Sequence, residues 1–406
     1  MMTKRTALLG LTLSGALLAA GCGSSKSTTA ATTAAPATAT TIAAGTTTAH
    51  SMAAMGAEGS LKGVCPDKVI VQTDWFPEAE HGATFQLMGA DAKPSKDTGS
   101  VVGSLTFKGK AQGVQLEIKG GGPLLGDQTV VSQMYKDPSI LLGYVSSDEA
   151  IKFSTDTPVV GVVAPQDKSP QVILWDKKSH PNAKTIADIA KEVDEVTVFG
   201  GATYIDYLVA AGIVPKAKAN FNYKGDKILA KPGADKIAHQ GFATAEPFQY
   251  AHLDTGAVDV GYSLVYDTGW KLYPEALSVR AAALKDPKTT ACLKLLVPMF
   301  QHAQIDYIAD HAAADKIIIA TVAAYDSFWK QSQADTDNSV KLQKELAIVG
   351  NGETPTLGDF EDARLADFIK KAIPILTADG KTKVKADLKP SDIATNEFID
   401  KTISYK

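Results

Sequence analysis

Several segments of this chain place acidic, hydroxyl or aromatic side chains where a predicted strand gives way to a helix or turn. The first is Asp74-Trp75-Phe76-Pro77, followed shortly by Glu80-His81. Three more are Ser146-Ser147-Asp148-Glu149, Thr244-Ala245-Glu246-Pro247-Phe248 and Tyr266-Asp267-Thr268-Gly269. Aromatic rings can stack on a planar ligand, hydroxyls can donate hydrogen bonds, and carboxylates can accept them from an amino group. Each of these side chains also has a purely structural alternative as a core ring, helix cap or turn residue.

Strand-like and helix-like segments alternate along the chain, which predicts layered α/β structure. Open α/β sheets bind ligands beyond the carboxyl ends of their strands, where the segments above begin. Capping boxes are expected at Ser146/Glu149 and Thr185/Asp188. Residues 92–110 form a polar, glycine-rich interruption, and Pro298 is expected to kink or end a helix. The predicted strands are 69–75, 114–118, 140–145, 159–163, 171–175, 196–199, 258–265 and 276–279, and helices dominate from residue 287 onward.

Composition and motifs exclude several classes of function. The net charge is −4 and there is no long basic run, so binding to nucleic acid is not expected. None of the seven histidines lies in a His-Glu-x-x-His motif, and there is no Cys-x-x-Cys pair. Gly121 and Gly126 have P-loop spacing but lack the Lys-Ser/Thr that must follow. No cofactor, metal or catalytic residue is therefore expected.

The N-terminus resembles a bacterial lipoprotein signal. Lys4 and Arg5 precede a short apolar stretch that ends in Leu18-Ala19-Ala20-Gly21-Cys22. Residues 1–22 are therefore predicted to be a signal peptide whose lipobox leaves Cys22 as the lipidated residue; the alternative is an ordinary signal with an incidental cysteine. Residues 23–60, rich in Ser, Thr and Ala, are predicted to form a disordered tether.

Two further cysteines, Cys65 and Cys292, remain in a chain that is predicted to be exported. A disulfide between them is expected in an oxidising compartment, and two buried thiols are the alternative.

The strand-end segments together resemble the substrate-binding proteins of ABC importers, in the family that binds nitrate, sulfonates, taurine and thiamine-pyrimidine precursors. The resemblance depends on Trp75-Phe76-Pro77 with His81, on the Ser-rich end at 146–147, on Glu246-Pro247, and on Asp267-Thr268-Gly269. It covers most of residues 69–280. Two departures are Ala245, where that family often has Asn, and the long passage at 92–110.

The resemblance implies a periplasmic-binding-protein-like (type II) fold with two α/β lobes joined by a hinge. Residues 65–160 and 263–406 would form lobe 1 and residues 161–262 lobe 2. The chain would be an extracytoplasmic monomer, lipid-anchored at the outer face of the cell membrane, that passes a small-molecule solute to an ABC permease. The implied ligand-binding residues are Asp74, Trp75, Phe76, His81, Ser146, Ser147, Thr203, Tyr204, Glu246, Phe248 and Asp267.

Carboxylates among aromatic rings favour an amine-bearing heteroaromatic solute, such as a thiamine pyrimidine precursor, over a sulfonate, taurine or nitrate. Two other classes remain open: an extracytoplasmic enzyme on the same fold, and a sensory or scaffold protein without a small ligand.

Overall fold

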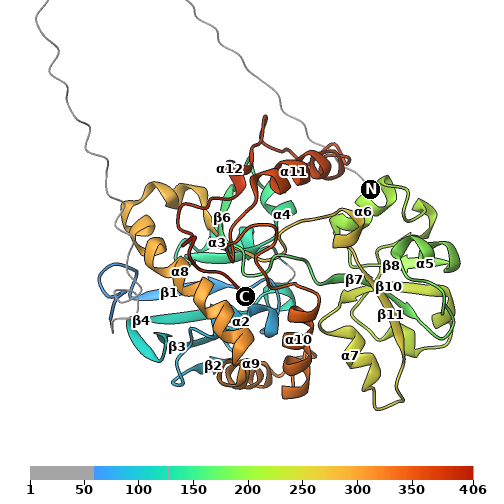
Figure 1. Ribbon diagram of the computed structural model, residues 1–406, viewed down its shortest axis with the longest axis horizontal. Coiled ribbons are helices and arrows are strands. Elements are labelled where there is room, and N and C mark those ends of the chain that lie inside the picture. The colour runs from blue at the N-terminus through green and yellow to red at the C-terminus, as the bar shows by residue number, and fades with distance from the viewer. Residues whose placement is uncertain (1–58, 127, 406) are drawn as a thin grey trace, which may run out of the picture. The chain divides into compact units, whose positions relative to one another are not determined.

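The computed structural model describes residues 59–126 and 128–405. These residues form two α/β lobes, each built around its own sheet (Figure 1), and the expected two-lobed α/β fold is confirmed. The predicted signal peptide with Cys22, and all but the last two residues of the predicted tether, lie outside the described residues. Within the described part of the chain, no helix combines the length and apolarity needed to cross a membrane.

The larger lobe is built on a seven-stranded mixed sheet with the strand order β2-β3-β4-β1-β5-β12-β6. Strand β1 pairs in parallel with β4 and β5, whereas β12 runs antiparallel to both β5 and β6. The strands are β1 (Lys68–Gln72), β2 (Lys93–Ser95), β3 (Ser100–Phe107), β4 (Lys110–Lys119), β5 (Leu142–Val145), β6 (Val159–Val163) and β12 (Ala276–Arg280).

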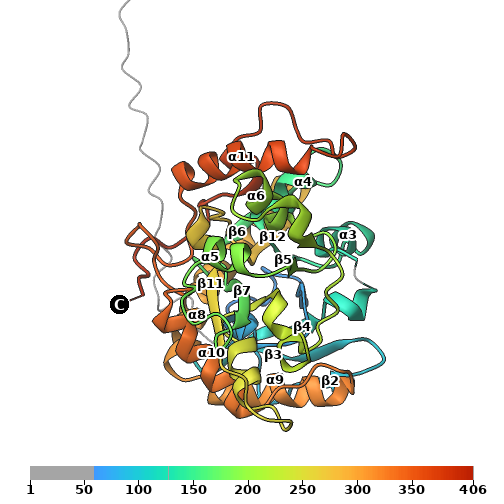
Figure 2. The same cartoon turned by 90° about the vertical axis from the view of Figure 1, so that its right-hand side faces the viewer.

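The smaller lobe has a five-stranded sheet with the order β11-β7-β10-β8-β9. Strand β10 is parallel to β8 and antiparallel to β7, which also pairs antiparallel with β11. The strands are β7 (Gln171–Asp176), β8 (Glu195–Thr197), β9 (Ala219–Asn220), β10 (Ile237–Phe242) and β11 (Val260–Leu264). Figure 2 shows this lobe facing the viewer.

Helices cover both sheets. The large lobe carries α2 (Gly82–Phe85), α3 (Val130–Lys136), α4 (Ser147–Lys152), α8 (Pro287–Ala309), α9 (Ala312–Tyr325), α10 (Gln333–Glu345), α11 (Asp362–Leu376) and α12 (Pro390–Ile393). The small lobe carries α5 (Ile186–Glu192), α6 (Thr203–Ala210) and α7 (Glu246–Ala251). The 3₁₀ segments are η1 (Ala79–His81), η2 (Gly122–Leu125), η3 (Lys216–Lys218), η4 (Ile228–Ala230), η5 (Ala234–Lys236), η6 (Tyr266–Thr268) and η7 (Ala281–Lys285).

The chain passes between the lobes twice, through residues 164–170 and 265–275. One side chain on α11, Arg364, contacts both passages. Its guanidinium pairs with Asp167 at 2.6 Å in the first passage, and both groups are nearly buried. It also donates to the backbone oxygens of Lys271 and Leu272 and lies 3.9 Å from the centre of the Tyr273 ring in the second. Helix α11 itself packs on α4 of the large lobe and α6 of the small lobe, so it fixes where the passages lie.

Three local expectations are corrected. Residues 92–110 are not an irregular interruption, because β2 and β3 lie within them and extend the sheet edge. Inward positions of β3, such as Val101, Leu105 and Phe107, are buried, but intervening Gly, Ser and Thr obscured this alternation in the sequence.

Helix α8 continues through Pro298. At the start of α4, Ser146 makes no cap hydrogen bond to the backbone, whereas the box at Thr185 and Asp188 is present.

A disulfide joins Cys65 to Cys292 across 227 residues of sequence. Cys65 precedes β1 and Cys292 lies in the first turns of α8, and both side chains are buried in the core of the large lobe. The bond therefore ties the beginning of the fold to the helix that covers its sheet.

Replacing both cysteines with alanine should lower the free energy of unfolding by about 2–5 kcal/mol, because the closed loop is long and the unfolded chain regains its freedom. Urea unfolding followed by circular dichroism measures the change. Reduction of the unaltered protein should give a similar loss, and reductant should leave the double variant unaffected. Equal midpoints for the oxidised protein and the variant would contradict this.

Candidate functional site

In both sheets, the edge at which most of the strands end adjoins the passages between the lobes. In the large lobe, β1, β4, β5 and β6 all end at one edge, and the antiparallel β12 begins there. In the small lobe, β8, β10 and β11 end at one edge, where β7 begins. The chain crosses between these two edges, so the residues just beyond the strands of both lobes gather in one region. This is where open α/β sheets place their ligands.

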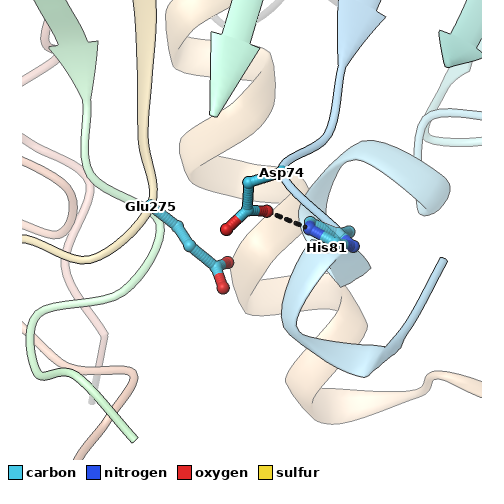
Figure 3. Close-up of side chains that lie close together, drawn as sticks. All are labelled: Asp74, His81 and Glu275. Carbon is cyan, nitrogen blue, oxygen red and sulfur yellow. Dashed lines mark hydrogen bonds and ion pairs between the residues drawn. The ribbon is translucent and has the colours of Figure 1, made fainter. Parts of the chain in front are cut away.

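Asp74, His81 and Glu275 form a compact group at the edge of the large lobe (Figure 3). Asp74 follows β1, His81 ends η1, and Glu275 immediately precedes β12. The His81 Nε2 atom lies 2.9 Å from Asp74 Oδ1. Glu275 is 4% exposed and its Oε2 atom has no hydrogen-bond partner. Burial, together with the charges of Asp74 and Glu80, raises the pKa of Glu275 well above its ordinary value.

Two more buried carboxylates come from the segment that leads into α2. Burial raises the pKa of Glu78 strongly, and the neighbouring charges of Glu80 and Glu275 add to the shift. The Oε1 atom of Glu78 has no hydrogen-bond partner. Burial also raises the pKa of Glu80, although its carboxylate accepts hydrogen bonds from Thr244 of the small lobe and from Ser339 of α10. Glu80 therefore links the two lobes directly.

A second direct link runs through Asp148 at the start of α4. Its carboxylate accepts hydrogen bonds from the hydroxyl of Ser146, at 2.5 Å, and from that of Thr203 in the small lobe. Ser146 and Thr203, both predicted to bind the ligand, thus donate to the same carboxylate. Asp148 itself was not among the predicted ligand-binding residues. Next to it, burial and the charge of Asp148 raise the pKa of Glu149 to about 8.

Aromatic rings face one another across the same region. The ring centres of Trp75 in the large lobe and Phe199, just after β8 in the small lobe, are 6.4 Å apart. Trp75 also meets Trp329 edge-on at 6.0 Å. Phe76 is buried and stacks on Trp329, while Phe328 contacts its edge. Of the two predicted rings, Trp75 lies at the interface of the lobes and Phe76 packs against other rings of the large lobe.

The other predicted residues make mainly local contacts. The Ser147 hydroxyl contacts the backbone of Tyr273. Tyr204 donates to Gln240 of β10 at 2.9 Å. Glu246 accepts from the backbone N–H of Phe242, and burial raises its pKa. Phe248 packs on His252. Asp267 is exposed on η6. Tyr204 and Glu246 lie at the strand-end edge of the small lobe, and no described contact joins Phe248 or Asp267 to the carboxylate group.

One small hollow lies between the lobes. It has a volume of about 10 Å³ and is lined by Glu78 and Glu80 of the large lobe and by Thr244 and Gln249 of the small lobe. That is room for about one water molecule, so a solute could occupy this hollow only if the lobes moved apart. A larger hollow of about 340 Å³ lies elsewhere, between α8 and the β3–β4 turn, beside the Lys108–Asp306 ion pair.

Three residues of this region were missed by the reading of the sequence. Glu275 precedes the predicted strand 276–279. The sequence does not show that this strand runs antiparallel to its neighbours, so it does not show that the residue before it lies at the edge where those neighbours end. Glu78 looked like the first residue of an ordinary helix. Phe199 was interpreted as part of a buried strand, although the following Gly200-Gly201 turn is the kind of signal that accompanies a strand end.

No protein-family model matches the chain, and no curated protein sequence matches it significantly. Solved structures with a similar arrangement include a Bordetella bronchiseptica protein (14% identity, TM-score 0.48, covering 82% of this chain and 96% of that one). An ABC transporter protein of Parabacteroides distasonis has 9% identity and a TM-score of 0.46, with 82% and 99% covered. The periplasmic aliphatic sulphonate binding protein of Escherichia coli has 15% identity and a TM-score of 0.40, with 70% and 93% covered. At TM-scores below 0.5, neither ligand nor activity transfers to this chain.

Replacing Thr203 with valine should favour separation of the lobes. The substitution keeps the side-chain shape but removes a hydrogen bond to the buried Asp148 carboxylate, and such charged hydrogen bonds contribute about 1.5–3 kcal/mol. Small-angle X-ray scattering should show a larger radius of gyration than for the unaltered protein. Thr98→Val, an exposed change confined to the large lobe, serves as the matched control. Identical scattering from all three proteins would show that this bond does not hold the lobes together.

Replacing Glu149 with glutamine should change how stability depends on pH. The folded protein keeps a proton on Glu149 up to about pH 8, whereas the unfolded chain releases it near the ordinary glutamate pKa of 4.5. Glu149 therefore favours folding most at low pH, and this contribution is lost as the pH rises through that window. Relative to the unaltered protein, Glu149→Gln should gain stability between about pH 5 and about pH 9. Urea midpoints measure this, with the exposed Glu397→Gln as control; parallel pH profiles would refute it.

Proposed function

We propose that this protein is an extracytoplasmic solute-binding protein that captures a small amine-bearing molecule between its two lobes and delivers it to the permease of an ABC importer. The observation that carries the proposal is the group of buried carboxylates at the strand-end edges. Among the described residues, neither Glu78 nor Glu275 has a Lys or Arg in ion-pair contact, and each keeps one buried oxygen without a hydrogen-bond partner.

The charge at these edges favours a solute that donates hydrogen bonds or carries positive charge. An amino or amidine group can donate to the free carboxylate oxygens and neutralise charge that burial has removed from water. A sulfonate, taurine or nitrate would bring a second negative group next to Asp74, Glu78 and Glu275. Such anions remain the alternative solutes, and the carboxylates disfavour them.

The aromatic pair favours a planar solute. Carbon atoms in contact lie about 3.5–4.0 Å apart. A ring stacked between two others therefore requires about 7–8 Å between the two outer rings. The rings of Trp75 and Phe199 are 6.4 Å apart in this structure. The two ring planes are tilted by 46°, so a small opening of the lobes together with rotation of one ring would create a seat for one heteroaromatic ring, as in a thiamine pyrimidine precursor.

The proposed location outside the cytoplasm is supported by the disulfide, since such bonds persist mainly in oxidising compartments. Cys22 would carry the lipid that holds the protein at the outer face of the membrane. The protein would act there as a monomer.

Catalysis is the alternative from another class. Carboxyl groups with raised pKa values beside a His–Asp pair are also the groups that perform general acid–base chemistry. We propose binding without turnover, because the carboxylates here have a simpler use as acceptors for an amine. Incubation of any identified ligand with the purified protein, followed by mass spectrometry, decides the question: new products would establish an enzyme.

A thermal-shift screen in the presence of EDTA tests the proposed solute class. Aminopyrimidines and other amine-bearing heteroaromatics should raise the melting temperature, since a ligand that binds only the folded state stabilises it. Sulfonates, taurine and nitrate should not. Stabilisation by the anions alone would overturn the assignment of the solute, and stabilisation by none of the compounds would count against the amine class.

For a ligand found in that screen, Trp75→Ala should weaken binding at least tenfold, because stacking on one ring contributes about 1–3 kcal/mol. Trp75→Phe keeps a smaller ring and should lose less affinity. Titration calorimetry measures both, and melting of the unliganded variants shows whether each is folded. Unchanged affinity in Trp75→Ala would remove this ring from the site.

A further inference from the structure

The group of Asp74, His81 and Glu275 has the composition and spacing of a metal site. One ligand atom from each residue can be chosen so that all three lie within 4.8 Å of one another. Atoms bound to one ion at about 2.1 Å in tetrahedral geometry lie about 3.4 Å apart, so side-chain rotations that move these atoms by about 1 Å would bring them into range. The three residues come from different places in the sequence, which is why no metal motif was found and no metal was expected.

The second observation concerns Glu275. Its side chain is directed toward Asp74 and His81 in Figure 3, and its Oε2 atom is buried with no hydrogen-bond partner. The described residues place no Lys or Arg in ion-pair contact with Glu275 or Asp74. A buried carboxylate without a partner is unfavourable unless something arrives to pair with it. A cation between Asp74 and Glu275 would satisfy both carboxylates at once.

The donor set narrows the choice of cation. One imidazole nitrogen with two carboxylate oxygens suits first-row divalent ions such as Zn²⁺ or Mn²⁺. Ca²⁺ and Mg²⁺ prefer oxygen ligands alone, and a copper(I) site would require sulfur. Asp74 is 41% exposed at its side chain, so an ion has a route from solvent to the group.

We propose that Asp74, His81 and Glu275 bind a divalent first-row metal ion, with Zn²⁺ as the best match. Three protein ligands leave a coordination position open for water or for a donor atom of a solute. Asp74 and His81 belong to the large lobe, and Glu275 is the last residue of the second passage, directly before β12 of that lobe, so the ion can bind whether the lobes are open or closed. The two proposals are tested separately, because metal binding is measured with no solute present and the solute screen is run in EDTA; with an ion bound, the free oxygen of Glu78 would remain as the acceptor for the amine.

A second cluster in the large lobe shows what distinguishes this site. His311, Asp315 and Asp337 also lie close enough to share an ion. There, however, Asp315 already accepts hydrogen bonds from His311, Tyr307 and Gln333, and Gln333 also donates to Asp337. The acidic groups are satisfied by protein donors, and the cluster serves as the matched control.

Titration calorimetry on the EDTA-treated, dialysed protein, with ZnCl₂ and MnCl₂ as probes, tests the proposal. We expect one ion per chain, at least tenfold weaker binding in Glu275→Gln and His81→Gln, and unchanged binding in Asp337→Asn. Titration with Co²⁺ should give a visible absorption band that His81→Gln alters. Absence of Zn²⁺ and Mn²⁺ binding, or equal affinity in Glu275→Gln, would overturn the site.

The test still decides between the outcomes if one of the variants fails to fold. Glu275→Gln removes a buried charge and should melt at or above the temperature of the unaltered protein without metal. Asp74→Asn changes an exposed side chain and should also lower Zn²⁺ affinity at least tenfold in a folded protein. If both variants fold and both keep the affinity, the proposal fails. A failed solute screen, run in EDTA, would leave this result unaffected.

Discussion

The arrangement of the whole site depends on the buried contact between Arg364 and Asp167. A buried ion pair recovers only part of the hydration that its charges lose, so its main effect here is on geometry. The Arg364 guanidinium also donates to backbone oxygens of the second passage and stacks on Tyr273. Both connections between the lobes are thus tied to one side chain of α11, and the two strand-end edges are set opposite each other.

The same geometry has an electrostatic cost, because it buries several carboxylates close together. Glu78, Glu80 and Glu275 are buried, and burial raises their pKa values. Hydrogen bonds across the interface, from Thr244 to Glu80 and from Thr203 to Asp148, offset part of that cost. A positively charged guest would offset more, and it would stabilise the closed state by the difference between its affinities for the two states. Closure and capture would then be one linked equilibrium.

The reading of the sequence predicted the layered α/β architecture, because hydrophobic alternation and helix caps are local signals. It also named Asp74, His81 and Thr203, which the structure places beyond the ends of β1 and β8; their contact with a ligand stays a prediction. It missed Glu275 because strand direction is set by pairing with β5, a long-range property. It mistook β3 for a loop because Gly103 stands at an inward position that alternation marks with an apolar residue. Ser146 does not cap its helix because the Asp148 carboxylate accepts the backbone N–H of Glu149 that a capping serine would take, and the Ser146 hydroxyl donates to that carboxylate.

The disulfide has a consequence for the integrity of the molecule. Both of its cysteines belong to the large lobe and lie 227 positions apart in the sequence, and the entire small lobe lies between them. A protease that cut a surface turn of the small lobe would produce two fragments that remain covalently joined through sulfur. The nicked protein would still migrate as one species until a reducing agent was added.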